Sequence, residues 1–446
     1  MGDAREAPTD AAARERELLR SVESAPWPRR WRVYLGLVGP GFLQSAMTLG
    51  GGTAVASLFA GAAFGYRLLW VAPVAMLLGC AMLSAVSWQT LSTGARPFEA
   101  MARHAGRPLA WAWAIGALVA SIVWHFPQYA LAGAVVSDLG DLAGLSGPSP
   151  AVAAFGVLAW AVATSFLYGR SGASRRRYER ALKYMVWGIV LAFAWVVART
   201  GVRDWGELLR GFFVPGLPEP RGELSAEMLV AAGLSAAVGV NMLFLYPYSL
   251  LARGWGRDHR RLARFDLGLG TFLPYVLAAS LMTIAAANTL HPWDSTSLSP
   301  LQAARGLVDH VGPTTGRLVF NLGVLGMAMS SISLHMVCAG FVAVELFGVE
   351  VGSLRYRLAT LLPTPGVLGP LLWKDLLWVA VPTTVLCGAL LPLAYGGFVV
   401  LQRSEPYLGA DRPRGAKGAL WLSAMLAAIA VLVGYLLLFL WRKVFA

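Results

Sequence analysis

The sequence VYLGLVGPGFLQSAMTLGGGTAVASLFAGAAF, residues 33–64, is a long apolar stretch with a glycine-rich break, Gly50-Gly51-Gly52-Thr53, near its middle. Each of three consecutive glycines weakens a helix by about 1 kcal/mol. In hydrocarbon, the amide and carbonyl groups that such a break frees must find other partners, and non-helical backbone is tolerated at that depth where it lines a cavity. The stretch therefore predicts a membrane helix that is interrupted beside a cavity.

The composition also indicates a membrane protein. Of the 446 residues, 57% are hydrophobic and 14% are charged, and the apolar runs reach the length of about 20 residues that spans a bilayer. The net charge of +13 comes from basic residues gathered in particular loops, which is typical of orientation signals and excludes a nucleic-acid surface. Cys80, Cys338 and Cys387 lie far apart in apolar segments, so they predict neither a disulfide nor a metal cluster.

Eleven apolar segments are candidate membrane spans. They lie at about 33–64, 68–92, 109–137, 150–168, 183–199, 227–252, 267–289, 316–347, 357–372, 375–401 and 419–441. Prolines and glycines interrupt the ninth, which is read either as a span or as an interfacial segment. Residues 1–31 are polar and predict a cytoplasmic N-terminal tail without a signal peptide. Residues 32–446 then form the membrane domain, with helices 1–5 over about 33–199, helices 6–10 over about 227–401 and helix 11 over about 419–441.

Arginine-rich loops predict the orientation. Clusters precede span 1, follow span 2, separate spans 4 and 5 and follow span 6, whereas residues 138–149 contain no Lys or Arg. This alternation places the N-terminus in the cytoplasm, with the chain in the cell membrane. Eleven spans place the C-terminus outside, although the pair Arg442-Lys443 there favours an even number.

The sixth span repeats the pattern of the first. Gly233, Gly239, Asn241 and Pro247 interrupt its apolar run, and the proline removes a backbone donor. Two interrupted helices five spans apart predict an all-α protein with two halves related as an inverted repeat, an arrangement typical of secondary transporters. The interrupted segments 50–53 and 238–244 are then expected to face each other across one cavity.

Further motifs make the chain resemble a known family. They are Gly39-Pro40-Gly41 before the first break, the run from Ala60 to Val71, Tyr178-Glu179-Arg180, the run from Leu245 to Ser249, Ser330-Ser331, Ala339-Gly340 and Leu391-Pro392. These resemble the NRAMP (natural resistance-associated macrophage protein) family of proton-coupled divalent-metal transporters, over most of the chain after residue 32. The resemblance implies the LeuT-type, or amino-acid/polyamine/organocation-type, fold of five plus five inverted helices, with broken helices 1 and 6, and metal-ion transport.

The positions that match the family's metal motifs carry other residues. The Asp-Pro-Gly-Asn motif falls on Gly50-Gly51-Gly52-Thr53, and the Met-Pro-His-Asn motif falls on Asn241-Met242-Leu243-Phe244. The matched ligand positions are therefore Gly50, Thr53 and Asn241. A glutamine of the family's tenth helix falls near Thr384, and an acidic pair linked to proton movement falls on His125 and Gln128. No Asp or Glu lies within a span away from its ends, so weak binding of Mn²⁺, Fe²⁺ and Cd²⁺ is expected.

The candidate site residues follow from the breaks and the matched positions. Those for substrate binding are Gly50, Gly51, Gly52, Thr53, Val238, Asn241, Phe244 and Thr384. Those for proton coupling are His125, Gln128 and His335, because an imidazole titrates near neutral pH, while a histidine bonded to a nearby carbonyl is the structural alternative. The expected partners are the lipid bilayer, a small solute or ion, and protons; no cofactor is expected.

Three interpretations of function stay open at this point. The first is metal-ion transport with the usual ligands replaced. The second is transport of a neutral, zwitterionic or carboxylate solute, because amides at the start of a half-helix suit a carboxylate, although the glycines could serve packing alone. The third is a receptor or scaffold that does not transport. The sequence has no GxSxG, Walker or HExxH motif, so no enzyme is predicted.

Overall fold

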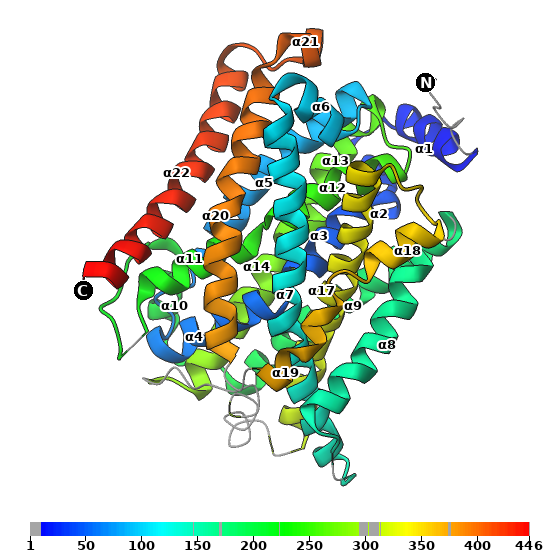
Figure 1. Ribbon diagram of the computed structural model, residues 1–446. Helices are drawn as coiled ribbons and strands as arrows, with labels where there is room; N and C mark the ends of the chain where they lie inside the picture. The colour runs from blue at the N-terminus through cyan, green and yellow to red at the C-terminus, as the bar shows by residue number, and fades with distance from the viewer. Residues whose placement is uncertain are drawn as a thin grey trace.

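The computed structural model describes residues 10–145, 147–168, 172–222, 224–293, 302, 312, 314–372 and 376–445. These residues form one bundle of helices (Figure 1). The only β pairing among the described residues is a single bridge between Arg221 and Leu224. We call one end of the bundle the α6 end, where α6 (Pro97–His104) and α21 (Glu405–Leu408) lie, and the other the α10 end, where α10 (Trp205–Phe213) and α19 (Gly369–Leu372) lie.

The helices fall into the two predicted halves and a final helix. The first half consists of α2 (Trp27–Leu37), α3 (Pro40–Thr48), α4 (Gly51–Phe64), α5 (Val71–Thr93), α7 (Arg107–Leu142), α8 (Pro150–Tyr168) and α9 (Gly172–Thr200). The second consists of α11 (Ala226–Ala237), α12 (Val240–Ala252), α13 (Arg260–Asp266), η2 (Leu267–Phe272), α14 (Leu273–Thr289), α17 (Thr315–Phe347), α18 (Leu354–Thr360), η3 (Thr364–Leu368), α19 and α20 (Leu376–Arg403). The final helix is α22 (Gly415–Phe445), which packs on α5, α11 and α20.

Three short elements join these helices at the α6 end. The predicted tail contains α1 (Asp10–Ser21), which packs beside η1 (Arg257–His259), and η4 (Gly409–Asp411) follows α21. Arg20 of α1 forms an ion pair of 2.9 Å with Asp258 of η1.

The described residues contain nine helices or helix runs that are long and apolar enough to cross a membrane, and the bent pair α3 and α4 makes a tenth. The predicted ninth span, 357–372, requires a correction, because it is not one helix. It consists of α18, η3 and α19, since its prolines remove the backbone donors that a continuous helix needs. α18 packs on α17, whereas η3 and α19 pack along α7 and continue toward the start of α20 near the α10 end (Figure 1).

Charged side chains fix the beginning of the first broken helix. The carboxylate of Asp266 accepts hydrogen bonds from Gly39 N at 3.0 Å and Gly41 N at 2.7 Å, at the N-terminus of α3. Arg253 donates from Nε to Glu179 Oε2 at 3.0 Å and from Nη1 to the carbonyl of Leu37. An anion at the N-terminus of α3 and a cation at the C-terminus of α2 both complement the helix dipoles, so the ends of these helices are held at the α6 end.

Candidate functional site

The first helix break lies at Leu49 and Gly50, between α3 and α4, which are bent by 57° from one another. The backbone of Gly50 is extended, with φ −126° and ψ −167°. A Cβ atom on Gly50 would lie 2.6 Å from Ser331 Oγ, and one on Gly52 would lie 2.5 Å from Trp124 Cζ3. Glycine at these positions therefore allows α7 and α17 to approach the break closely.

A glutamine on α7 supplies partners for the backbone at this break. Gln128 Oε1 accepts a hydrogen bond from Gly51 N at 2.7 Å, and Gln128 Nε2 donates to Ser331 Oγ at 2.9 Å. Ser331 Oγ donates in turn to the carbonyl of Met47 at 2.9 Å, at the end of α3. These bonds replace part of the interrupted helix ladder, as a buried backbone requires in a membrane.

The second break lies at Val238 and Gly239, between α11 and α12, and the backbone of both residues is extended. Thr48 Oγ1, at the end of α3, donates to the carbonyl of Ala236 at 2.6 Å and to that of Ala237 at 3.0 Å. The end of one broken helix thus satisfies the freed carbonyls of the other. The two breaks consequently lie at the same depth in the bundle.

A pocket of about 20 Å³ lies where the two breaks meet. A space of this size has room for about one water molecule. The lining residues are Met47, Thr48, Gly50, Gly52, Thr53, Trp124, Gln128, Ser235, Ala236, Gly239, Asn241, Met242, Ser331 and His335. The set contains hydroxyl, amide, thioether and imidazole groups, and no carboxylate, lysine or arginine. The pocket is therefore polar without a fixed charge.

A comparison with known families identifies the chain. The model of the Nramp family, described as natural resistance-associated macrophage protein-like, matches residues 41–440. The chain belongs to the Nramp family. Similar proteins include two named divalent metal cation transporter MntH, both from Klebsiella pneumoniae. One is 24% identical over 423 residues, covering 93% of this chain and 97% of the relative, and the other is 24% identical over 349 residues, covering 77% and 80%.

Solved structures show the same fold. The manganese transporter of Eremococcus coleocola, in complex with an aromatic bis-isothiourea substituted compound, has a TM-score of 0.74 at 14% identity, covering 90% of this chain and 86% of that one. Mhp1, a nucleobase-cation-symport-1 family transporter, has a TM-score of 0.56 at 14% identity, covering 91% and 93%. The predicted LeuT-type fold with broken helices 1 and 6 is confirmed, as is the predicted family.

Six of the predicted residues line the pocket of this Nramp-family chain, namely Gly50, Gly52, Thr53, Gln128, Asn241 and His335. Gly51 lies beside them, with its N–H bonded to Gln128. His125 lies behind His335, with 5.4 Å between the ring centroids, and its Nδ1 is 2.6 Å from the carbonyl of Ser121. The side chain of Thr384 lies outside the described residues. The binding and coupling roles of all these residues stay predictions.

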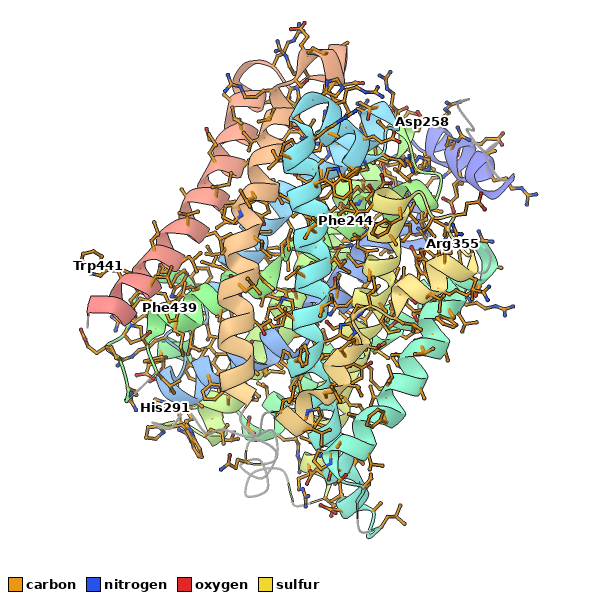
Figure 2. All side chains as sticks on the ribbon, viewed as in Figure 1. Phe244, Asp258, His291, Arg355, Phe439 and Trp441 are labelled. Atoms are coloured by element: carbon orange, nitrogen blue, oxygen red, sulfur yellow. The ribbon has the colours of Figure 1, made fainter. Side chains whose placement is uncertain are left out.

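Two further predicted residues, Val238 and Phe244, also lie outside the pocket lining. Val238 turns its side chain toward α5. A Cβ atom built on Gly79 of α5 would lie 3.0 Å from the Cβ of Val238. Phe244 packs within the bundle against Trp113 of α7, with ring centroids 4.7 Å apart, and against Tyr248, at 5.0 Å (Figure 2). Each residue of a helix is rotated by about 100° from the last, so α12 presents Asn241 and Met242 to the pocket and turns Phe244 toward the aromatic residues of α7.

Sequence reasoning missed three large side chains of the pocket, those of Met47, Trp124 and Met242. All three count as apolar in a search for membrane spans, and this hides their ability to contact a ligand. One signal was present in the sequence. Met47 lies three residues before Gly50, and Met242 lies three residues after Gly239, so each methionine flanks a break within one helical turn.

Two further cavities follow α4 from the pocket toward the α10 end. Thr53 lines both the central pocket and a second one of about 30 Å³, which carries the hydroxyl groups of Ser57, Tyr275, Ser280 and Thr283. A vestibule of about 630 Å³ then opens between the ends of α4 and α14 and the loop around α10. Hydroxyl groups thus continue from the breaks along α4 as far as the second cavity.

The vestibule is rich in arginine. Its lining includes Arg67, Arg203, Arg210 and Arg221, together with His291, which lies at the α10 end (Figure 2). Burial lowers the pKa of His291 below its ordinary value, and three of the arginines, Arg221, Arg203 and Arg67, lower it further. The fixed charges in the vestibule lining are those of its arginines and of Glu207 and Glu219.

The buried carboxylates lie at the ends of helices and away from the pocket. Asp138, Glu179, Glu227 and Asp266 are each at most 4% exposed. Within the part of the chain that the structure describes, no three His, Cys, Asp or Glu side chains come together as a metal cluster. A cation in the central pocket would therefore meet neutral donors only.

Proposed function

We propose that the chain is a secondary transporter that carries a metal ion through the central pocket, with neutral donors in place of the carboxylate found at the family's matched position. Membership of the Nramp family supports metal-ion transport, as do the relatives named divalent metal cation transporters. The similarity to solved structures supports the fold in which such transport takes place.

The observation that carries this proposal is the pocket shared by the two breaks. Transporters of this architecture place substrates where interrupted helices meet, because freed backbone groups and small side chains supply donors there. Thr53 and Asn241 occupy matched ligand positions and both line the pocket. Asn241 is buried. Its Oδ1 accepts a hydrogen bond from Met242 N at 3.0 Å and keeps a second lone pair for a metal ion, while its Nδ2 has no hydrogen-bond partner among the described groups.

The orientation of the chain is part of the same proposal. Arginines gather at the α6 end, in the segments before α3, after α5 and after α12, which favours a cytoplasmic α6 end by the positive-inside rule. The vestibule at the α10 end then faces outward. The second cavity along α4, which shares Thr53 with the central pocket, lies on the side of this vestibule, and we propose that an ion follows this side in the outward-facing half of the cycle.

Protons are the proposed coupling ions, and His125 and His335 are the proposed carriers. Their rings are adjacent, and His335 lines the pocket. Uptake by the wild type should therefore depend on a pH gradient. The variant His125→Gln should keep uptake but lose that dependence, and uptake that ignores the pH gradient in the wild type would contradict the proton role.

The carboxylate alternative has less support from the same geometry. It requires free amides at the first break, yet Gly51 N donates to Gln128 Oε1. It also requires a counter-charge, and no lysine or arginine lines the pocket.

Flux into proteoliposomes tests the proposal. Purified protein is reconstituted, and uptake of Mn²⁺, Zn²⁺, Cd²⁺, Ag⁺, alanine and acetate is measured against protein-free vesicles. We expect uptake of at least one metal ion, reduced at least tenfold by Asn241→Leu, which keeps the volume and removes the oxygen donor. Gly36→Leu is the matched control, because a Cβ at Gly36 meets nothing within 4 Å. Uptake of alanine or acetate without any metal ion would overturn the proposal.

A further inference from the structure

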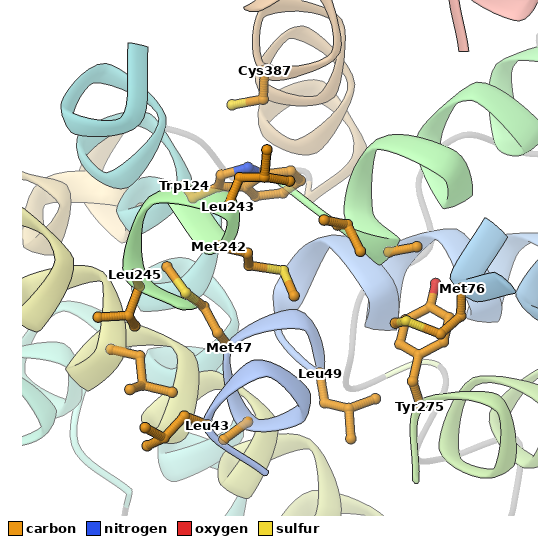
Figure 3. Close-up of a cluster of buried hydrophobic side chains, with 14 of the residues drawn as sticks. Leu43, Met47, Leu49, Met76, Trp124, Met242, Leu243, Leu245, Tyr275 and Cys387 are labelled. Carbon is orange, nitrogen blue, oxygen red and sulfur yellow. The ribbon is translucent and has the colours of Figure 1, made fainter. Parts of the chain in front are cut away.

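Two thioethers border the central pocket, one from each broken helix. Met47 lies in the last turn of α3 and Met242 in the first turn of α12, and they are 3% and 2% exposed. Both line the pocket. Figure 3 shows their side chains between these two helices, with the indole of Trp124 beside them. Thioether sulfur is a soft ligand, and in proteins it selects soft cations such as Cu(I).

An imidazole completes the set of donors. His335 of α17 lines the same pocket and is 3% exposed, and its Nδ1 has no hydrogen-bond partner among the described groups. A buried ring nitrogen without a partner is rare, because losing its hydrogen bond to water is costly. A metal ion would satisfy that nitrogen, and imidazole is a ligand that copper accepts.

The indole ring adds an attraction for a positive charge. Trp124 is the residue that a side chain on Gly52 would strike, so its ring covers the break directly. The face of an indole attracts a cation that lies within about 6 Å of it, most strongly where water is excluded. Trp124 is 5% exposed, which meets that condition.

The absence of an acidic residue from the lining decides the charge of the guest. The cost of moving an ion from water into a medium of low polarity rises with the square of its charge, so a monovalent ion costs about one quarter as much as a divalent ion of equal radius. A divalent ion usually needs carboxylates to offset that cost. A soft monovalent ion is held by neutral sulfur and nitrogen ligands, and the pocket offers both kinds beside its hydroxyl and amide groups.

We propose that the substrate of this site is a soft monovalent cation of the Cu(I) and Ag(I) class. Met47, Met242 and His335 are its ligands, and Trp124 closes the site. This inference rests on the proposed metal-ion transport and names the class of ion. It differs from the expectation for a divalent ion, which would favour oxygen ligands and a negative charge.

Silver binding tests the inference, because Ag⁺ is stable in air and has the same ligand preferences. The three cysteines also bind silver, so the measurements use a background in which Cys80, Cys338 and Cys387 are replaced by Ala. Titration calorimetry in chloride-free nitrate buffer gives the affinity for Ag⁺ and for Mn²⁺. We expect Ag⁺ to bind at least a hundredfold more tightly than Mn²⁺.

The decisive variants are Met47→Leu and Met242→Leu, which keep the volume and remove the sulfur. Each should weaken Ag⁺ binding at least tenfold. Met47→Leu should leave the unfolding temperature nearly unchanged, whereas Met242→Leu should lower it, because the sulfur of Met242 also accepts a hydrogen bond from Gly239 N at 3.4 Å. Met425→Leu is the matched control, because Met425 is equally buried but lies in α22 and does not line the pocket. If the cysteine-free background fails to fold, the same three variants in the wild-type chain still isolate the contribution of the two pocket sulfurs.

The outcomes separate this inference from the proposed function. Silver binding that is insensitive to both pocket methionines overturns the inference, and so does uptake of Mn²⁺ by a protein that does not bind Ag⁺. In both cases metal-ion transport stands if the flux assay detects a metal ion. A flux assay in which no metal ion moves overturns the proposed function itself, and the inference with it.

Discussion

The ends of the bundle bury charged side chains with their partners, whereas the pocket at its centre is lined by neutral groups. At the α6 end, Arg253 pairs with the buried Glu179 at 3.0 Å, and Asp266 holds two amides of the first broken helix. At the α10 end, Asp138 is bound by Arg317 and Asn321. At the centre, the pocket between the breaks has only neutral donors.

This difference indicates a division of roles within the fold. The buried charges of Glu179, Asp266 and Asp138 have fixed partners, so they hold helices in place and are not available to a substrate. The central groups instead bond to one another through neutral hydrogen bonds, and some of them, such as His335 Nδ1 and Asn241 Nδ2, have no described partner. A buried group that lacks a partner destabilises the fold, which is the expected cost of a site that binds something.

The largest effect is expected from breaking the pair at the α6 end. Arg253→Ala leaves Glu179 buried without its nearest cation, since the side chain of Glu179 is only 3% exposed. Losing one partner of a buried ion pair costs about 3 to 5 kcal/mol, so unfolding in detergent should shift to a clearly lower temperature. Adding Glu179→Gln to Arg253→Ala should restore part of the loss. A double variant that is as unstable as the single one would show that the ion pair is not the cause.

A smaller effect is expected at the α10 end. Asn321 Nδ2 donates to Asp138 Oδ2 at 2.6 Å, and Arg317 also binds this carboxylate. Asn321→Leu should cost about 1.5 to 3 kcal/mol, the usual range for a hydrogen bond to a charged group. The cost should be less than that of Arg253→Ala, because Asp138 keeps its arginine. Chemical unfolding of both variants in one detergent gives this ranking, and a reversed order would contradict it.

At the centre, adding a single methyl group should lower both the stability of the fold and metal-ion uptake. Gly52→Ala places a Cβ against the ring of Trp124, and overpacking of this kind costs about 1 to 3 kcal/mol. It should also reduce metal-ion uptake at least tenfold, because the indole must move into the pocket. Adding Trp124→Leu should relieve the destabilisation.

The control for this variant is Gly36→Ala. Gly36 is exposed within α2 and has open space around it, so alanine there should change stability by about 1 kcal/mol or less, in the favourable direction. Equal effects of the two substitutions on stability would show that the central glycine has no special packing role.

The sequence predicted the centre better than the ends. The glycines at 50–52 and the interruption near Gly239 located both breaks, since the cost of unsatisfied backbone in a membrane leaves few explanations for such a pattern. The partners of Asp138 and Glu179 could not be predicted, because Arg317 and Arg253 lie 179 and 74 residues away in the chain. Contacts between distant helices depend on packing and leave no periodic signal in the sequence.

The same limit applies at the site. The side-chain directions after the second break depend on where α12 begins, so the sequence pattern alone does not tell that Met242 faces the pocket and that Phe244 faces α7. Hydropathy ranks methionine with leucine, although only methionine has a lone pair to offer a metal ion. The predicted ninth span failed for a local reason, since proline can be tolerated in a membrane helix or can break it, and neighbouring helices decide which occurs.

The smallest effect is expected from an exposed ion pair, and it tests whether burial or charge explains the stability of the ends. Glu405 lies at the surface of α21, 60% exposed, with Arg412 at 3.4 Å and Arg414 at 3.2 Å. Glu405→Gln should cost at most about 1 kcal/mol in dilute buffer. In 1 M salt the Debye length falls to about 3 Å, so this cost should vanish there. The loss of unfolding free energy caused by Arg253→Ala should stay nearly constant between the two salt concentrations. Ions in solution do not reach a pair that is shielded within the bundle. If both losses of unfolding free energy fell equally with salt, water would reach Glu179, and the contrast between buried ion pairs at the ends and neutral groups at the centre would fail.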